Sequence, residues 1–272
     1  MKTDRAWLLG LMLPCAVVFL VFFAIPLTRL LLIGGSGELG WSAYTAAFTE
    51  PRYLRSMVST VLLSVVVTLA TLVISSIAGV FLARQTFTGR QVLTAMLTLP
   101  LAFPGVVIGF MVIMLGGRQG LIPLTTELLI GERLVFAYSM VGLFVGYIYF
   151  SIPRTILTVM AAAEKLDPQL MEAARSLGAS NWRVLLDVLI PGLRPALLAA
   201  GAICFATSMG AFGTAFTLAT RIDVLPMIIY TEFTLQANIA MAAALSFVLG
   251  LLTWAALAFA RSLTGNTVAA AA

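Results

Sequence analysis

The sequence predicts an all-α membrane protein with six transmembrane helices. Of its 272 residues, 61% are apolar and only 10% are charged, and the mean hydropathy is +1.07. Water-soluble domains do not have this composition. Several apolar runs also reach the roughly 20 residues that a helix needs to cross about 30 Å of hydrocarbon.

The first two predicted spans cover residues 6–32 and 57–83. Lys2 and Arg5 precede the first run, as in a secretory signal peptide. Its apolar part is about twice as long as the ~7–15 residues of a signal, so we expect an uncleaved helix. The only polar residues of the second run are Ser and Thr.

The third predicted span, 94–115, contains Pro100 and Pro104. Neighbouring helices can satisfy the carbonyl groups that a proline frees, so we expect a kink or a break within this span. The remaining spans are predicted at 134–160, 195–219 and 239–260. The whole chain is expected to be one transmembrane domain, 1–272, with a long polar segment, 161–191, between the fourth and fifth spans.

The distribution of basic residues predicts the orientation, because Lys and Arg near the ends of spans stay on the cytoplasmic side. With the N-terminus inside, the cytoplasmic segments hold ten of the 16 basic residues and five acidic ones, whereas six bases and six acids lie outside. Both termini are therefore expected in the cytoplasm. The net charge of +5 is explained by this topology without nucleic-acid binding.

The sequence contains no Ser/His/Asp or Cys/His arrangement of the kind that enzymatic chemistry uses. It has no His, and Cys15 and Cys204 lie in predicted spans, where a lone thiol behaves as a small apolar group. The usual metal ligands and the commonest general base are therefore absent. A phosphate-binding P-loop is absent too, because neither Lys2 nor Lys165 follows a glycine. If ATP drives transport, the ATPase is another chain.

Two short amphipathic helices are predicted in the segment 161–191. Asp167 is a candidate N-cap for the first helix, and Gly178 supplies its left-handed stop. The second helix begins near Ser180 and is expected to end as Pro191 leads back to the membrane. Apolar residues repeat at helical spacing in both: Leu170, Ala173, Ala174 and Leu177 in the first, Trp182, Leu185, Leu186 and Leu189 in the second.

Such a pair of helices, joined at a glycine, forms a rigid protrusion that can dock in a partner's groove and transmit movement. The alternative is an amphipathic pair that lies on the bilayer surface. Ala173 and Ala174 favour the protein partner, because small side chains permit close backbone approach whereas a lipid-facing stripe favours larger ones.

The segment resembles the EAA loop of ABC importer permeases, whose pattern is Glu-Ala-Ala, three residues, Gly, nine residues, Ile, one residue and Leu-Pro. The matching residues are Glu172, Ala173, Ala174, Gly178 and Pro191, with Val188 and Ile190 at the two aliphatic positions. The runs 53–84 and LPLAFPGVVIG are similar to the polyamine, iron, sulfate and molybdate branch of this family.

The resemblance implies a type I permease fold in a bacterial inner membrane. In the family, the EAA helices insert into a cleft of the nucleotide-binding subunit, so the seven matching positions would be the coupling residues. The expected partners are two ATPase subunits, a second permease, identical or homologous, and a periplasmic substrate-binding protein. No cofactor is expected on this chain, since ATP and Mg²⁺ would bind to the ATPase. The alternative to a coupling role for Glu172 is a surface ion pair with Arg175, which would stabilise the helix by a few tenths of a kcal/mol.

The fifth predicted span carries a stripe of small and polar residues at i, i+3, i+7 and i+10: Thr207, Gly210, Thr214 and Thr217. The stripe either lines a substrate pathway or mediates helix packing, as Gly105 and Gly109 could on the third span. Relatives for sulfate, molybdate and iron commonly carry Glu where Ala211 stands, so the resemblance implies a polyamine first. Iron, sulfate, molybdate and a phosphonate are the alternative substrates.

Charged residues separate the remaining function classes. A secondary transporter or channel typically places charges inside its spans, whereas here Arg29 and Arg154 are expected near span ends, where they can reach the interface. The class of membrane-embedded enzymes is disfavoured, because this sequence shows no arrangement of catalytic residues. In the outer segment between the last two spans, Asp223 and Glu232 would suit a cationic substrate, but solvated loop charges are the default expectation, also for Arg221.

Overall fold

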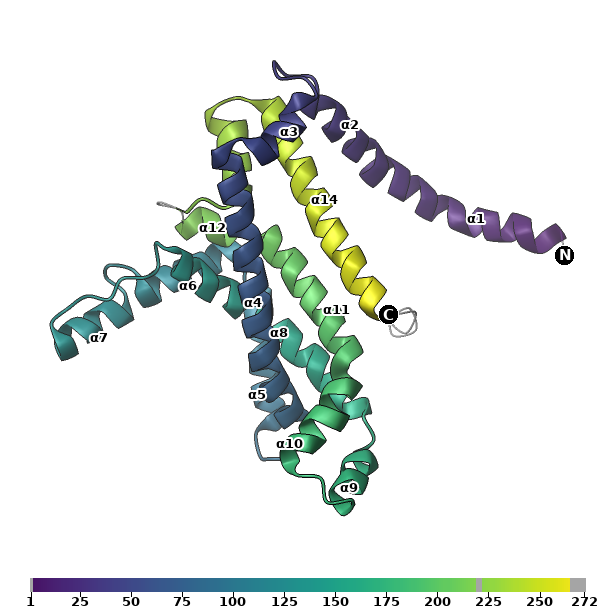
Figure 1. Cartoon of the computed structure of the whole chain (residues 1–272), viewed down its shortest axis with the longest axis vertical. Coiled ribbons are helices and arrows are strands. Elements are labelled where there is room, and N and C mark those ends of the chain that lie inside the picture. The colour runs from purple at the N-terminus through teal and green to yellow at the C-terminus, as the bar shows by residue number, and fades with distance from the viewer. Residues whose placement is uncertain (1, 219–221, 265–272) are drawn as a thin grey trace. The chain divides into compact units, whose positions relative to one another are not determined.

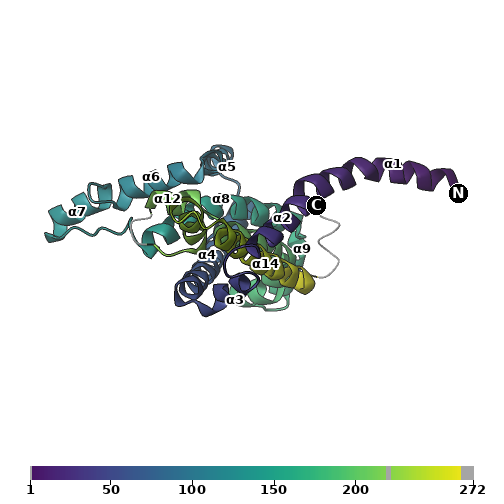
Figure 2. The ribbon, with the colours of Figure 1, turned by 90° about the horizontal axis from the view of Figure 1, so that it is seen from above.

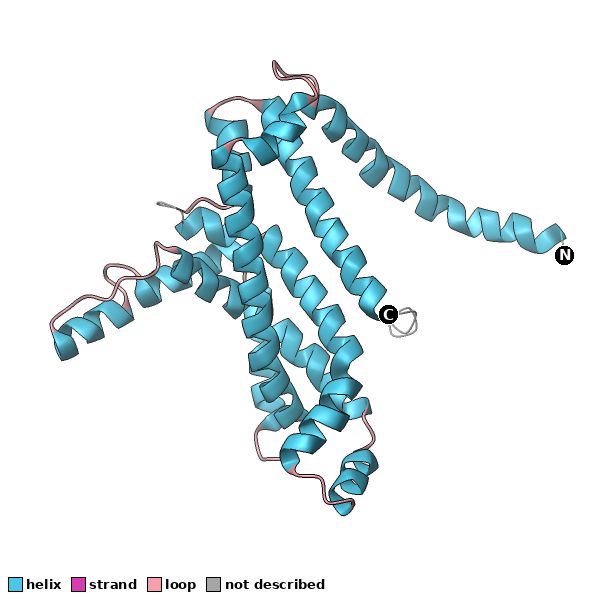
Figure 3. Cartoon of the chain, in the orientation of Figure 1, coloured by secondary structure: helices cyan, strands magenta, loops and turns pink. Residues whose placement is uncertain are grey.

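The computed structural model describes residues 2–218 and 222–264. Of these described residues, 83% are helical and none lies in a strand (Figure 3). Within this part of the chain, six helical stretches are long and apolar enough to cross a membrane. The all-α class and the number of spans are therefore confirmed.

The observed spans differ from the predicted ones mainly in the third and fifth. They are Gly10–Gly34, Pro51–Arg84, Gly105–Ile130, Met140–Lys165, Asn181–Met209 and Ile239–Ser262. The predicted break in the third span is confirmed, because the backbone is extended at Phe103 and Pro104. The prediction of 195–219 for the fifth span is wrong at both ends, since its helix starts 14 residues earlier and ends at Met209.

The chain divides into two compact units, of which the first comprises Met1–Met57 and Ile228–Leu251. A π-helical turn, Leu20–Ala24, joins α1 (Lys2–Phe19) to α2 (Ile25–Gly34), and the three form one long arm (Figure 2). None of the span's apolar window is buried within the chain.

The other end of the first unit packs around Tyr44 on α3 (Ser42–Thr49). The Tyr44 hydroxyl donates a 2.6 Å hydrogen bond to the carbonyl oxygen of Leu31, and its ring meets that of Phe247 on α14 (Ile239–Thr264) edge to face. Burial raises the pKa of Tyr44, which keeps the hydroxyl protonated as a donor. Gly34 lies directly against the Tyr44 hydroxyl, where no side chain would fit.

The second unit comprises Val58–Met227 and Leu252–Ala272. Figure 1 shows three of its helices side by side: α4 (Pro51–Arg84), α8 (Met140–Lys165) and α11 (Ile190–Met209). Glycines permit this approach, because a Cβ atom on Gly79 would lie 3.0 Å from the carbonyl oxygen of Ile156 and one on Gly201 would lie 3.0 Å from Leu72.

Shorter elements complete the second unit. They are α5 (Arg90–Thr98), a 3-10 turn (Leu99–Ala102), α6 (Gly105–Gly116), α7 (Leu121–Ile130), α9 (Pro168–Ser176), α10 (Asn181–Val184), a π-helical turn (Leu185–Leu189), α12 (Gly213–Leu218) and the start of α13 (Leu225–Tyr230). Buried residues of α4, α6, α8, α11 and α12, among them Val67, Val112, Leu143, Cys204 and Leu218, form one core. That core fixes the helices that surround the cavity described below.

Candidate functional site

The first helix of the segment 161–191 is α9, and both of its ends have the predicted caps. The Asp167 side chain accepts a 2.9 Å hydrogen bond from the backbone N–H of Gln169. At the other end Gly178 has a φ of +84°. The N–H groups of Gly178 and Ala179 donate to the carbonyl oxygens of Arg175 and Ala174 at 2.9 and 3.0 Å. This pair of bonds is a complete Schellman motif, which turns the chain sharply after α9.

The second helix, α10, begins at the predicted Ser180 cap, whose hydroxyl accepts a bond from the N–H of Arg183. It does not end at Pro191, so that prediction is wrong. The chain stays helical through the π-helical turn Leu185–Leu189 into α11, and Pro191 is tolerated in the first turn after the π segment. α10 is therefore continuous with the helix of the fifth span.

Apolar contacts hold α9 against the ends of α8 and α11 (Figure 1). Leu166, Met171 and Leu185 pack on a buried cluster that contains Val159 and Leu189. A guanidinium nitrogen of Arg84 on α4 adds a 3.2 Å hydrogen bond to the carbonyl oxygen of Leu166. These contacts join α9 to α4, α8 and α11.

The opposite face of α9 exposes apolar side chains. Leu170, Ala173 and Leu177 lie three and four residues apart on one face, and all are exposed, Leu177 by 89%. On α10, Trp182 is exposed by 66%. The exposed face of α9 and the neighbouring Trp182 thus present apolar side chains, which is typical of a protein-docking surface.

The structure places the other predicted coupling residues around this stripe. Glu172 is exposed and forms no ion pair within the described residues, so the surface pair with Arg175 is not formed there. Ala174 and Val188 are half-buried, whereas Ile190 and Pro191 are exposed. Glu172 and Arg175 also line a cavity between α4, α9 and α10. The carboxylate of Glu172 is free to meet a partner.

A second cavity, of about 400 Å³, lies between α6, α8, α11 and α12 in the second unit. That volume is in the range of small-molecule sites, roughly 300–1,000 Å³. Of the predicted pathway residues, Thr207, Gly210 and Thr214 line it and Thr217 does not. The stripe predicted on a single helix is wrong, because α11 ends at Met209 and α12 starts at Gly213.

Two of the predicted pathway residues contribute to helix packing. The hydroxyl of Thr214 donates to the carbonyl oxygen of Gly105 on α6 at 2.9 Å, and that of Thr217 donates to the carbonyl oxygen of Val106 on α6 at 3.3 Å. A Cβ atom on Gly109 would lie 2.6 Å from the Cβ atom of Thr217. Thr217 therefore mediates helix packing, as one of the two interpretations predicts, whereas Thr207 and Gly210 line the cavity.

Replacing Gly109 by alanine is expected to destabilise the protein by about 1–3 kcal/mol, because the new methyl group overlaps Thr217 and the backbones must separate. Gly250→Ala is the matched control, since nothing lies within 4 Å of a Cβ atom there. Thermal unfolding in detergent measures both. Equal unfolding temperatures for the two variants would exclude a close contact between α6 and α12.

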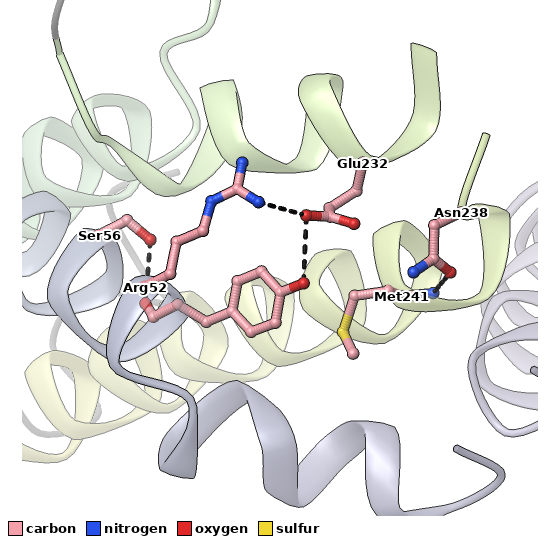
Figure 4. Close-up of polar contacts among 6 residues, drawn as sticks. Arg52, Ser56, Glu232, Asn238 and Met241 are labelled. Atoms are coloured by element: carbon pink, nitrogen blue, oxygen red, sulfur yellow. Dashed lines mark hydrogen bonds and ion pairs between the residues drawn. The ribbon is translucent and has the colours of Figure 1, made fainter. Parts of the chain in front are cut away.

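A buried carboxylate lies in the first unit, where a solvated loop charge was expected. Glu232, on a π-helical turn (Thr231–Leu235), is 0% exposed. Its Oε1 accepts 3.1 Å hydrogen bonds from the guanidinium of Arg52 and the hydroxyl of Tyr53 (Figure 4). With its amide nitrogen turned inward, Gln236 donates to Oε2 at 2.8 Å. The solvated-charge expectation is wrong for Glu232, whereas Asp223 is exposed and Arg221 lies outside the described residues.

The fold and these features define a six-span helical membrane protein with a cavity between its helices and a protrusion that exposes apolar side chains. No cluster of three or more His, Cys, Asp or Glu side chains occurs among the described residues. The chain belongs to the family of binding-protein-dependent transport system inner membrane components, which matches residues 73–266. It is therefore a multi-pass inner-membrane protein and a permease subunit of an ABC importer.

Individual relatives are transport permeases. The chain is 34% identical over 185 residues to the molybdenum transport permease ModB of Escherichia coli K12, covering 63% of this chain and 77% of ModB. It is 30% identical over 213 residues to the sulfate transport permease CysT of the same strain, covering 78% and 73%. It is 28% identical over 248 residues to the putative 2-aminoethylphosphonate permease PhnU of Salmonella typhimurium, covering 89% and 86%.

A solved structure confirms the fold. The chain superimposes on a chain of a bacterial alginate ABC transporter with a TM-score of 0.79 and 18% sequence identity, and 97% of each chain is covered. At this identity, the similarity extends to the type I permease fold alone.

Proposed function

We propose that this permease subunit moves a small oxyanion or phosphonate into the cytoplasm by alternating access, driven by a separate ATPase that docks on α9 and α10. The exposed apolar stripe of Leu170, Ala173 and Leu177 carries the docking part of the proposal. Glu172 lies beside it without an ion-pair partner among the described residues. Since α10 continues into α11, movement of the docked ATPase would tilt a helix that lines the cavity.

The partners follow from this mechanism. ATP and Mg²⁺ would bind to the ATPase subunits, and the permease would need no cofactor of its own. A second permease, identical or homologous, would complete the pathway, and a periplasmic binding protein would deliver the solute. With the protrusion on the cytoplasmic side, both termini lie in the cytoplasm, as the distribution of basic residues indicates.

The names of the relatives support an anionic solute. ModB, CysT and PhnU are named for molybdenum, sulfate and 2-aminoethylphosphonate transport. These solutes share tetrahedral oxygen groups that accept hydrogen bonds. A polyamine, favoured by the sequence resemblance, stays a prediction that none of these relatives supports.

Transport assays test the proposal. The permease is reconstituted in proteoliposomes with the ATPase and binding protein encoded beside its gene. Uptake of labelled molybdate, sulfate, 2-aminoethylphosphonate and putrescine is then measured with and without ATP. We expect ATP-dependent uptake of one of the three anions. Uptake without ATP would indicate a secondary transporter or channel, and uptake of putrescine alone would contradict the anion assignment.

A further inference from the structure

A basic side chain lies deep inside the fourth span. The sequence places Arg154 near a span end, but α8 runs from Met140 to Lys165. Arg154 is thus within two residues of the midpoint of α8, and about 16 Å from its end at 1.5 Å per residue. Arg154 therefore lies farther from the end of α8 than from the end of the predicted span at residue 160. Ionisable residues within spans usually mark a substrate or ion pathway.

Arg154 lines a narrow extension of the cavity. This extension, of about 20 Å³, shares Phe150, Ser151 and Thr207 with the cavity of about 400 Å³. The guanidinium carbon of Arg154 lies 5.5 Å from the centre of the Phe150 ring. A cation–π contact of this kind holds the guanidinium beside the cavity and leaves its five N–H donors available.

The extension follows one face of each of two helices. The lining residues of α8 are spaced at i, i+3, i+4 and i+7, which is the spacing of one helical face, and those of α11 have the same spacing. These residues are Ser151, Arg154, Thr155 and Thr158 on α8, and Ala200, Ile203, Cys204 and Thr207 on α11. Arg154 and Thr158 lie nearer the end of α8 that leads into the coupling protrusion. The extension therefore runs from the large cavity toward the cytoplasmic segment 161–191.

Two serine hydroxyl groups at the cavity have no hydrogen-bond partner within the described residues. Ser151 and Ser208 line the cavity and are 6% and 3% exposed. A buried hydroxyl left without a partner costs roughly 1–3 kcal/mol. Because they line the cavity, an oxygen atom of a solute or of water that enters it would satisfy these two groups.

The other hydroxyl groups that line the two cavities already donate hydrogen bonds to carbonyl oxygens. Ser151 and Ser208 differ from them in having no acceptor within the described residues. The hydroxyl of Tyr147 donates to the carbonyl oxygen of Ala211 at 2.6 Å, and the threonines donate to carbonyl oxygens as well. Neither cavity is lined by Asp or Glu within the described part of the chain. A cationic solute would thus meet one positive charge and no carboxylate.

We propose that Arg154, Ser151 and Ser208 form an intramembrane binding site for a tetrahedral oxyanion or phosphonate, an inference that rests on the transport function proposed above. Arg154 supplies charge and a fork of N–H donors that matches two oxygen atoms of such an anion. Ser151, three residues earlier on the same face of α8, supplies a hydroxyl donor, and Ser208 supplies another from α11. The positive charge of Arg154 disfavours a polyamine, which would be repelled by it.

Equilibrium binding to the complete transporter tests the site. The permease–ATPase complex in nanodiscs, without binding protein, is titrated with labelled molybdate, sulfate and 2-aminoethylphosphonate. The anion that the wild type transports should bind about 10-fold to 100-fold more weakly to Arg154→Gln, as for loss of a hydrogen bond to a charged group. Arg154→Lys should retain part of the affinity. The Ser151→Ala/Ser208→Ala double variant should bind at least threefold more weakly.

Ser64→Ala is the matched control, because Ser64 on α4 is equally buried, lacks a partner within the described residues and lines neither cavity. Its affinity should equal that of the wild type. Two results would overturn the proposed site and leave the proposed transport function intact. One is unchanged binding and uptake in the Arg154 and serine variants. The other is a wild-type complex that transports an anion without binding it. If the wild type transports putrescine and none of the anions, both proposals fall. ATP hydrolysis by each variant complex shows that it has assembled.

Discussion

Replacing Gly178 by valine is expected to abolish uptake and to leave the protein in the membrane. Gly178 has a φ of +84°, where an L-residue costs roughly 1–2 kcal/mol and a β-branched one more. No atom lies within 4 Å of a Cβ atom at this position, so the substitution acts on the backbone alone. Relief of the strain would undo the Schellman motif and reorient α9 relative to α10. Uptake and the amount of permease in membranes measure the two effects.

Gly89→Val is the matched control. Gly89 also has a positive φ, +95°, and open space around its Cβ position, but lies in the loop before α5. It carries the same local backbone cost outside the protrusion, so its uptake should be retained. Gly178→Asn should be milder than Gly178→Val, because asparagine tolerates the left-handed region. Equal uptake by Gly178→Val and Gly89→Val would remove Gly178 from the coupling residues.

Replacing Arg52 by alanine is expected to lower the free energy of unfolding by about 3 kcal/mol, because the fully buried carboxylate of Glu232 loses its counter-charge. The value lies at the low end for buried pairs because the Arg52 side chain is 47% exposed. Tyr53 and Gln236 still donate to Glu232 in the variant. Denaturant or thermal unfolding in detergent measures the loss.

Two comparisons isolate the charge effect. Arg133→Ala breaks an exposed ion pair with Glu127 of 2.7 Å and should cost at most about 1 kcal/mol. Adding Glu232→Gln to Arg52→Ala should restore most of the lost stability, since the buried group is then neutral. If the double variant is no more stable than Arg52→Ala, the cost arises from lost packing of the Arg52 side chain.

The coupling protrusion was the part of the site best predicted from sequence, because its signals are local. Asp167, Gly178 and Ser180 cap or stop helices through bonds to residues at most five positions away, and such bonds leave a pattern in the sequence. The continuation of α10 through Pro191 was missed, since a π-helical turn has no comparable sequence signal.

The spans were located by hydropathy, but their limits depend on tertiary packing. The run past Met209 stays apolar, so hydropathy alone extends the fifth span beyond the break at Gly210, where α12 turns away to pack against α6. Hydropathy places the fourth span about five residues earlier than α8, so Arg154 lies nearer to the predicted end than to the observed end.

The polar interactions between distant residues were beyond reach of the sequence. Glu232 bonds to Arg52 across 180 positions, and no local pattern distinguishes such a carboxylate from a solvated one. The unpartnered hydroxyl groups of Ser151 and Ser208 have meaning only once α8 and α11 are seen to enclose a common cavity. The signal in the sequence was an arginine within an apolar run. It could be interpreted as an intramembrane residue only once the bounds of α8 were known.

Site-specific photo-cross-linking tests most directly whether a separate ATPase drives this permease through α9. A photoreactive residue is placed at Leu177, which is 89% exposed, or at Leu128 on α7, which is 86% exposed. In membranes that contain the assembled transporter, a cross-link to the ATPase subunit is expected from position 177 and none from position 128. Absence of the ATPase from the products at position 177, or equal cross-linking from position 128, would contradict coupling through the protrusion.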